Sequence, residues 1–278
     1  MDGKKELSLE EVHQATLEVL LFVRDLCDKI GIKYYLAFGT LLGAARHSGF
    51  IPWDDDADIW MKREDYMKLF QYMDKHSDEL IPYSYCSREN NALYPNSINR
   101  ITNLSYDYID TVKNVNMGYG VFVDVYPLDL CGNSNEEYRV LYKQVARINA
   151  LYECYLDGYA YSGNLIKSIV KRAINKTLHV RFPQREIMLD WINRKTYDVL
   201  QKKDLRDSKK IGVVVGWGYN QAYDLAFFEK EDEAEFGGKY FRVPYNYKGL
   251  LGYIYGDYMK LPPEGKRVSY HGYKIYKK

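Results

Sequence analysis

The stretch from Phe38 to Trp60, FGTLLGAARHSGFIPWDDDADIW, constrains the fold most, because it sets a glycine turn, an arginine and four aspartates between two apolar runs. The aromatic and apolar run Tyr34–Phe38 ends at Gly39, and this pattern predicts a buried strand. Leu41–Arg46 has good helix formers around one glycine, which predicts a short helix. The first N–H groups of such a helix have no partner inside the helix, so they are open to an anion.

A glycine and a proline then turn the chain toward a second predicted strand, Asp56–Trp60. Side chains two positions apart share one face of a strand, so we expect Asp56 and Asp58 to project together while Ala57 and Ile59 face the core. Two adjacent carboxylates repel each other, and a divalent cation with oxygen ligands relieves that repulsion. The pattern therefore predicts a cation site, with Mg²⁺ as the expected ion and Mn²⁺ as the alternative.

The main alternative for this acidic run is a solvated surface turn, which is what most short runs of like charge are. The neighbouring sequence argues against it, because Ile51 and Trp53 precede the run and Ile59 and Trp60 follow it. A calcium-binding EF-hand loop is excluded, since its spacing of aspartates, glycine and a final glutamate is absent.

A third acidic residue, Asp124, lies within the apolar run Val121–Pro127. A charge in a buried strand is costly unless it is paired or bound to metal, so Asp124 is a candidate third carboxylate for phosphoryl transfer. The alternative is a carboxylate that pairs with a core arginine or caps a neighbouring loop. Arg100 is similarly open to two interpretations, as a phosphate contact or as a cation paired with a nearby aspartate.

These residues together resemble the signature of the LicD family of phosphotransferases, to which the fukutin-related proteins are similar. The resemblance extends through Asp124 and returns near the C-terminus, and it leaves out residues 131 to about 224. The matching residues are Gly39-Thr40, Leu41-Leu42-Gly43, Arg46-His47, Gly49, Ile51-Pro52-Trp53-Asp54-Asp55-Asp56-x-Asp58, Pro244–Lys248 and Tyr255–Pro263.

The resemblance implies an α+β fold, a nucleotidyltransferase-like mixed sheet flanked by helices with a largely helical insertion. It also implies transfer of a phospho-alcohol, such as phosphocholine from CDP-choline, to a sugar hydroxyl of a cell-surface glycan or teichoic acid precursor, with release of CMP. Lipopolysaccharide or capsule modification belongs to the same class of reaction. The partners implied are thus a CDP-alcohol donor and a glycan acceptor, which could be lipid-linked.

Family site positions are carried over residue by residue. Asp54, Asp56 and Asp58 match metal and nucleotide-diphosphate positions, and Asp124 matches the third acid, so we expect Asp56, Asp58 and Asp124 to be catalytic and all four to bind metal. Residues expected to contact the donor are Gly39, Thr40, Arg46, Trp53, Asp54, Asp55, Asn246, Tyr247 and Lys248. If the alcohol is choline, aromatic faces must hold its trimethylammonium group. Trp53, Trp60, Trp217 and Tyr219 are the candidates, although for each of them we favour a core or scaffold position.

Composition supports an ordinary globular protein, with 46% hydrophobic and 28% charged residues among 278. A net charge of +1 argues against a nucleic-acid binder that works by bulk electrostatics. The four cysteines form no CxxC pattern, so we expect free thiols in a reducing compartment. We expect a cytoplasmic protein, because the sequence shows neither a signal peptide nor an apolar run long enough to span a bilayer.

We expect residues 1–278 to form one LicD-type catalytic domain with a helical, basic insertion at 132–206. Within it, residues 164–206 carry eleven Lys or Arg against four Asp or Glu, a net +7. An apolar stripe runs among these cations, at Leu165, Ile166, Ile169, Val170, Ala173, Ile174 and Leu178. We favour a helix that docks this stripe on its own domain; the alternative is peripheral contact with an anionic membrane.

Two other function classes remain open at this point. A metal-dependent glycosyltransferase also uses Asp-x-Asp to hold a nucleotide-sugar diphosphate, but it leaves the element from Gly39 to Arg46 unexplained. A non-catalytic protein that binds choline or glycan would need aromatic repeats, which are absent, and it leaves Asp124 unexplained.

Overall fold

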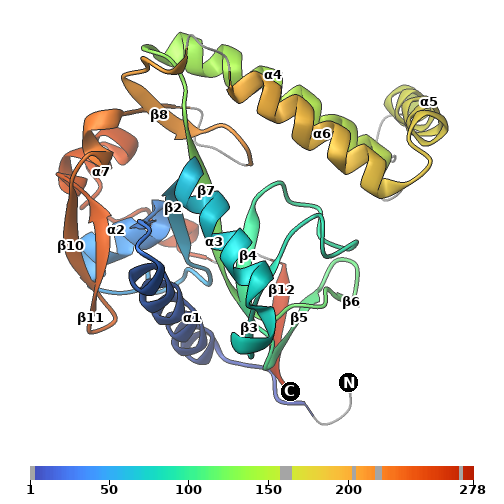
Figure 1. Ribbon diagram of the computed structural model, residues 1–278. Helices are drawn as coiled ribbons and strands as arrows, with labels where there is room; N and C mark the ends of the chain where they lie inside the picture. Colours follow the sequence, from blue (N-terminus) through green and yellow to red (C-terminus); the bar gives the residue numbers. More distant parts are fainter. Residues whose placement is uncertain (1–3, 157–164, 202–204, 217–220, 269–271) are drawn as a thin grey trace. The chain divides into compact units, whose positions relative to one another are not determined.

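The computed structural model describes residues 4–156, 165–201, 205–216, 221–268 and 272–278 (Figure 1). The chain divides into two compact units. The first, here called the sheet unit, comprises Met1–Ser87, Ile98–Leu128 and Tyr223–Lys278, and the second, the helical unit, comprises Arg88–Ser97 and Asp129–Ala222. The predicted α+β class is confirmed.

The sheet unit is built around a mixed sheet with strand order β1-β2-β7-β4-β3. Its strands are β1 (Tyr35–Leu36), β2 (Asp58–Lys62), β3 (Tyr83–Cys86), β4 (Asn99–Asn103) and β7 (Val121–Leu130). β2 and β7 are parallel, and the other pairs are antiparallel. The first nine residues of β7 are almost all buried, as expected for a central strand covered on both faces.

Four α-helices belong to the sheet unit: α1 (Leu9–Ile30), α2 (Phe38–His47), α3 (Arg63–Lys75) and α7 (Tyr247–Tyr255), with short 3-10 turns η1 (Ser77–Glu79), η4 (Leu225–Phe228) and η5 (Glu264–Lys266). α1 begins with a capping box, in which Ser8 Oγ accepts from the Glu11 N–H and the Glu11 carboxylate accepts from the Ser8 N–H. It ends at Gly31, whose φ of 69° is the left-handed conformation that glycine adopts freely. Both ends depend on residues that lie within a few positions of one another in the sequence.

Further strands complete the sheet unit: β5 (Tyr106–Asp110), β6 (Val115–Asn116), β9 (Tyr223–Asp224), β10 (Glu231–Phe236), β11 (Lys239–Pro244) and β12 (Tyr273–Lys277). β10 and β11 form a hairpin whose turn residues, Gly237 and Gly238, both have positive φ, as this tight turn requires. β12, at the C-terminal end, pairs with β5, which pairs with β6. The sequence did not predict this three-stranded sheet.

The helical unit contains α4 (Asn135–Tyr155), α5 (Leu165–Arg181), α6 (Arg185–Leu200) and β8 (Lys210–Val213), with α4 and α6 side by side (Figure 1). Its core gathers aromatic and aliphatic side chains, among them Tyr152, Leu178, Phe182 and Met188. The buried Arg88 donates to Asn149 Oδ1 at 2.8 Å and lies over the Tyr152 ring, which joins segment 88–97 to α4. The sequence analysis did not place segment 88–97 in the helical unit.

The insertion of residues 132–206 into one catalytic domain spanning 1–278 stays a prediction. Part of the expected basic segment, Asn164, Lys202, Lys203 and Asp204, lies outside the described residues. Among the residues that are described, no helix combines the length and the apolar character needed to cross a bilayer.

Candidate active site

Strand register sets three charged side chains next to one another on the central sheet. Asp58 of β2 lies directly opposite Asp124 of β7, and Asp124 lies directly opposite Arg100 of β4. Residues opposite each other on paired strands project to the same face, so two acids and one base lie in a row. Carboxylate oxygens of Asp56, Asp58 and Asp124 all lie within 4.8 Å of one another. We call these three residues the acidic cluster.

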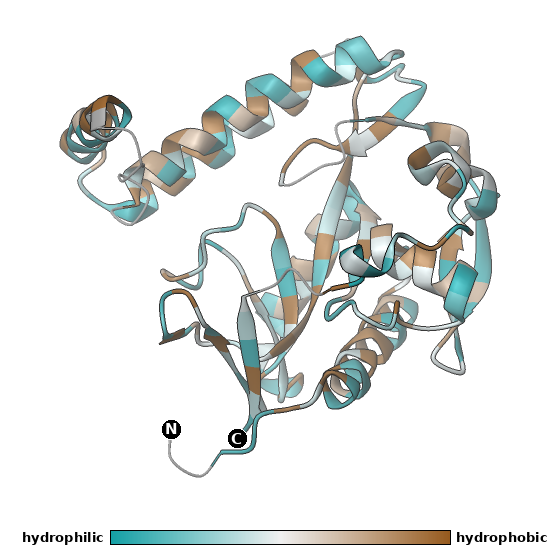
Figure 2. Cartoon of the chain, turned by 180° about the vertical axis from the view of Figure 1, so that it is seen from behind, coloured by the Kyte–Doolittle hydropathy of each residue, from teal (hydrophilic) through white to brown (hydrophobic). Residues whose placement is uncertain are grey.

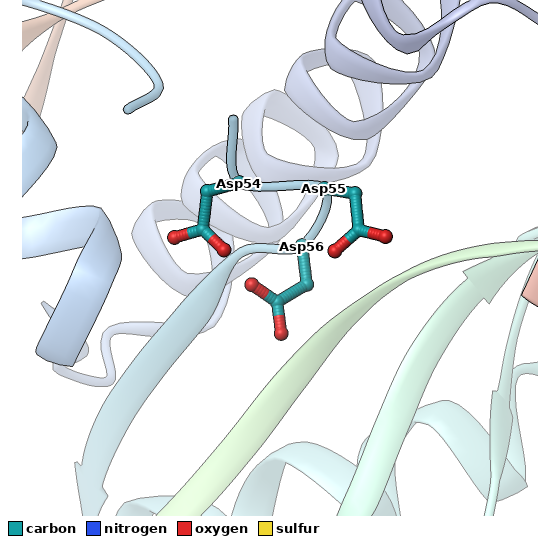
Figure 3. A group of neighbouring side chains, drawn as sticks. All are labelled: Asp54, Asp55 and Asp56. Atoms are coloured by element: carbon teal, nitrogen blue, oxygen red, sulfur yellow. The ribbon is translucent and has the colours of Figure 1, made fainter. Parts of the chain in front are cut away.

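Asp56 reaches the cluster by a route that differs from the predicted one. β2 begins at Asp58, so Asp56 belongs to the loop before it rather than to a strand position two residues away. This loop turns where the Asp54 N–H donates to the Ile51 backbone oxygen at 2.9 Å. Figure 3 shows the side chains of Asp54, Asp55 and Asp56 on one side of the loop, and their carboxylate oxygens also lie within 4.8 Å of one another.

Two distant parts of the chain hold the backbone of that loop. His13 Nε2 of α1 lies 2.6 Å from the backbone oxygen of Asp54. The Tyr273 hydroxyl of β12 donates to the backbone oxygen of Asp55 at 2.7 Å. Burial first, and then the Asp55 and Asp56 carboxylates, raise the pKa of Tyr273, so its hydroxyl keeps the proton that it donates.

Asp58 is the most constrained member of the acidic cluster. Its side chain is buried, and its Oδ1 has no hydrogen-bond partner. Burial first, and then the carboxylates of Asp56, Asp124 and Asp54, raise its pKa well above the ordinary value, while Arg100 lowers it. An ionised Asp58 therefore needs additional positive charge.

Arg100 supplies positive charge on the other side of Asp124. Its Nε donates to Asp124 Oδ1 at 2.6 Å and its Nη2 donates to Oδ2 at 3.1 Å, the two-pronged geometry that guanidinium and carboxylate groups favour. Both side chains are nearly buried, at 12% and 7% exposed. Of the two interpretations of Arg100, the pairing with an aspartate is the one observed, and Asp124 both pairs with an arginine and belongs to the cluster.

Aromatic rings surround the Arg100 guanidinium. Its central carbon lies 3.8 Å from the centroid of the Phe122 ring and 5.6 Å from that of Tyr119, whose hydroxyl accepts from Nη1 at 2.9 Å. Tyr108 and Tyr273 stack on each other beside these rings, at a centroid distance of 4.6 Å. Packing against aromatic faces favours the charged arginine and fixes its direction toward Asp124.

The first turn of α2 packs against the loop and β2. A Cβ on Gly39 would lie 2.7 Å from Asp54 Oδ2, so any larger residue would displace the Asp54 carboxylate. Thr40 Oγ1 accepts from the Asp58 N–H at 2.8 Å. Phe38 begins the helix instead of ending the strand, with a φ of 42° that is strained for a bulky side chain. Its ring packs edge-on against Trp60 and Tyr126.

Other expected donor-binding residues lie farther along the same elements. Arg46 is in the last turn of α2, two turns after Gly39 and so on the same face; its Nη1 donates to the Tyr258 backbone oxygen at 3.0 Å. Asn246 precedes α7 with a φ of 51°, and Tyr247 and Lys248 open that helix, which packs on α2. Their contact with a nucleotide stays a prediction.

The aromatic candidates for a choline site are only partly described. Trp60 is fully buried in the core, where it contacts Tyr223 and Phe228, which agrees with the core position that we favoured for it over a ligand contact. Trp53 is half-buried, with the Arg267 guanidinium 5.8 Å from its ring centroid. Trp217 and Tyr219 lie outside the described residues.

The same part of the chain matches a known family. Residues 31–127 match the sequence model of the nucleotidyltransferase domain of LicD, FKTN and FKRP proteins. The chain contains a LicD-family domain. All three residues of the acidic cluster, together with Gly39 and Arg100, lie within its bounds.

Individual relatives extend the likeness beyond the LicD-family domain. Lipopolysaccharide cholinephosphotransferase LicD of Haemophilus influenzae is 28% identical over 276 residues, which cover 98% of this chain and 99% of that protein. An uncharacterized protein of Rickettsia prowazekii is 45% identical over 73 residues, 26% of this chain and 25% of that protein. Ribitol 5-phosphate transferase FKRP of Mus musculus is 42% identical over 52 residues, 19% of this chain and 10% of that protein.

The acidic cluster of the LicD-family domain fits a divalent cation on three observations. It offers three carboxylates within reach of one ion, one of them has a buried oxygen without a partner, and the local charge is negative after Arg100 is counted. Oxygen ligands of this kind suit Mg²⁺ and Mn²⁺.

Sequence reasoning missed Tyr126 and Tyr273. Tyr126 follows Asp124 by two positions on β7 and so shares its face; burial first, and then Asp58, Asp124 and Asp56, raise its pKa. Strand alternation alone could have identified Tyr126 as a residue of the site. Tyr273 gave no local signal, because its place depends on β12 pairing with β5.

Proposed function

We propose that this protein transfers phosphocholine, or a similar phospho-alcohol, from CDP-choline to a sugar hydroxyl of a cell-surface glycan or teichoic acid precursor, and releases CMP. We further propose that it acts in the cytoplasm. The family match and the named activity of the Haemophilus influenzae relative support the class of reaction. The observation that carries the proposal is the convergence of Asp56, Asp58 and Asp124 from two separate chain segments.

Asp56, Asp58 and Asp124 would hold Mg²⁺, with Mn²⁺ as the alternative, and Asp54 lies close enough to Asp56 to contribute. A bound divalent cation supplies positive charge that binds diphosphate oxygens and stabilises the charge that develops during phosphoryl transfer. The buried Asp58 Oδ1, without a hydrogen-bond partner, is the atom with most to gain from such a ligand.

Asp124 orients the acceptor and takes its proton. The sugar oxygen attacks the phosphorus that bears the alcohol, the bond from that phosphorus to the CMP oxygen breaks, and the hydroxyl proton passes to a carboxylate oxygen of Asp124. Arg100 donates one hydrogen bond to each oxygen of this carboxylate and thereby fixes its plane. Each oxygen keeps a second lone pair for the acceptor.

The start of α2 would receive the donor phosphates. Its first N–H groups have no side-chain cap, and Gly39 brings the backbone close to Asp54. Arg46, on the same face, would add positive charge. Thr40 positions Asp58 through its backbone hydrogen bond, and Trp53, Asp55, Asn246, Tyr247 and Lys248 would complete the nucleotide contacts.

The test is an assay with CDP-choline, Mg²⁺ and candidate sugar acceptors that measures CMP release. We expect CMP to appear only with acceptor and divalent cation, and Asp56→Asn to lower the rate by about a thousandfold or more. Asp190→Asn, the same change at an exposed position of α6, is the matched control and should leave the rate unchanged.

A second readout separates loss of metal from loss of chemistry. Mg²⁺ should raise the Tm of the wild-type protein and of the Asp190→Asn variant, and it should raise that of Asp56→Asn much less. Release of UDP from a nucleotide-sugar would instead indicate a glycosyltransferase. Transfer from another CDP-alcohol but not from CDP-choline would keep the reaction class and change the substrate.

A further inference from the structure

Helix α5 uses one of its faces to pack within the helical unit. Leu178 and the following Phe182 are buried in its core. Asn175 Nδ2 donates to the backbone oxygens of Cys154 and Tyr155, at 2.8 and 3.0 Å, and the His179 ring stacks on Tyr155 at 4.2 Å. This face therefore docks on the end of α4. Of the apolar stripe that we expected to dock, Leu178 is buried here, whereas Ile166, Ile169, Val170 and Ile174 are exposed, so the expectation is wrong for most of the stripe.

The opposite face of α5 is apolar and exposed. Its aliphatic side chains range from 37% exposed at Ile174 to 79% exposed at Val180; the others are Ile166, Ile169 and Val170. At about 100° per residue, these five positions fall within a sector of roughly 140°. We call this set the α5 apolar face. In Figure 2, α5, seen nearly end-on, carries both hydrophobic brown and hydrophilic teal segments.

Cations border the α5 apolar face on both sides. By the same helical geometry, Lys167 lies next to one border and Lys176 next to the other, with Lys171 and Arg172 farther round toward the docked face. Arg181 lies at the C-terminal end of the helix, within the angular range of the apolar sector. The helix contains five Lys or Arg and no Asp or Glu, so its net charge is +5.

We propose that the α5 apolar face is a docking surface for an anionic lipid bilayer. A helix that lies in a membrane interface buries an apolar sector among the acyl chains and keeps cations beside the headgroups, and this is the distribution found here. A second copy of this chain fits poorly, because two such faces would bring +5 against +5. The surface is independent of the proposed function, since vesicle binding needs neither donor nor acceptor.

The test is flotation of the full-length protein with vesicles of phosphatidylcholine alone or with about a third of phosphatidylglycerol, at low and at physiological salt. We expect binding to the anionic vesicles, weakened by salt, and little binding to the neutral ones. Absence of binding to anionic vesicles at low salt would overturn the proposal.

Two double variants separate the apolar from the electrostatic contribution to vesicle binding. Ile169→Ser with Val170→Ser removes part of the apolar sector, and Arg172→Glu with Lys176→Glu reverses two charges of the helix; each pair should weaken binding by about tenfold or more. Matched controls on exposed positions of α4 are Val140→Ser and the pair Arg139→Glu with Lys143→Glu, which should bind like wild type. Equal binding by all variants would contradict the assignment to α5.

Two further measurements complete the test: the depth of α5 in the bilayer and the oligomeric state of the protein. Tryptophan fluorescence of a Val170→Trp variant should be quenched by lipids brominated on the acyl chain more than that of a Val140→Trp variant. Sedimentation velocity should show the same association state for wild type and Ile169→Ser with Val170→Ser. A dimer that this double variant dissociates, without vesicle binding, would assign the face to a second copy and overturn the proposal.

Discussion

Asp58 and Asp124 of the acidic cluster are buried on neighbouring strands, whereas most charged groups of α5 are exposed and follow one another at helical spacing. In the cluster, the Asp124 carboxylate meets the Arg100 guanidinium in one defined geometry. Along α5, the cations flank an apolar sector. A buried charge needs a partner in one geometry, so single substitutions there should be costly, while an exposed charge tolerates change and acts collectively.

The largest expected change in stability comes from Arg100→Met. It leaves the Asp124 carboxylate buried beside Asp58 without its guanidinium partner, so we expect the free energy of unfolding to fall by about 3 kcal/mol in metal-free buffer. Urea denaturation measures this. Added Mg²⁺ should restore part of the loss, since a divalent cation bound by the cluster would neutralise the same carboxylates.

The matched control for that prediction is Arg194→Met on α6. Arg194 pairs with Asp190, and both side chains are mostly exposed, at 65% and 70%. We expect a change within about 0.5 kcal/mol. If Arg100→Met and Arg194→Met lowered the free energy of unfolding equally, burial would not be what distinguishes the acidic cluster from an exposed ion pair.

A smaller effect should separate the two faces of α5. Leu178→Ala removes buried methyl groups from the helical unit and should cost about 2–3 kcal/mol, whereas Ile169→Ala on the α5 apolar face should change stability by less than about 0.5 kcal/mol. Thermal and urea unfolding followed by circular dichroism would show the difference. Equal losses would mean that the outer face is covered by protein.

The smallest expected effect on stability is a gain, whereas the preceding substitutions lower it. Asp58→Asn should raise the free energy of unfolding of the metal-free protein by about 1 kcal/mol at pH 7, because it removes a buried charge among like charges. It should also abolish transfer.

The pH dependence of this gain follows from the raised pKa of Asp58. Between the ordinary pKa of an aspartate, about 4, and the raised value, the folded wild type binds more protons than the unfolded chain, so its stability falls as pH rises. The advantage of Asp58→Asn should therefore be small near pH 4 and grow toward neutral pH. If the stability advantage of Asp58→Asn shrank with rising pH instead, burial would not be what sets the pKa of Asp58.

Much of the site could be predicted from local patterns. Asp124 stood out as a charge in an apolar strand, and the alternation in Asp56–Trp60 indicated another strand. In the structure these two strands pair, with Asp58 opposite Asp124. The capping box at Ser8 and the glycine at the end of α1 are features of the same local kind, because each depends on residues a few positions apart.

Other features depend on contacts between distant segments, which periodicity does not contain. We expected Phe38 to belong to a strand, because an aromatic residue favours a strand locally. In the structure Phe38 begins α2 instead, and its ring packs on Trp60 and Tyr126. The choice between a phosphate contact and an ion pair for Arg100 required the register of β4 on β7. For α5, the apolar stripe could be recognised from the sequence, but not which part of it the helical unit covers.

The hydrogen bond from Tyr273 to Asp55 joins positions 218 residues apart. Ribosomes make the aspartate loop well before β12, so that hydroxyl is missing while the intervening segment is being translated. The loop acquires this support only once β12 has been made and has paired with β5. A nascent chain arrested before β12 would thus carry every acidic residue of the cluster yet lack the anchor that steadies the loop, which makes the final geometry of the site depend on the synthesis of a distant strand.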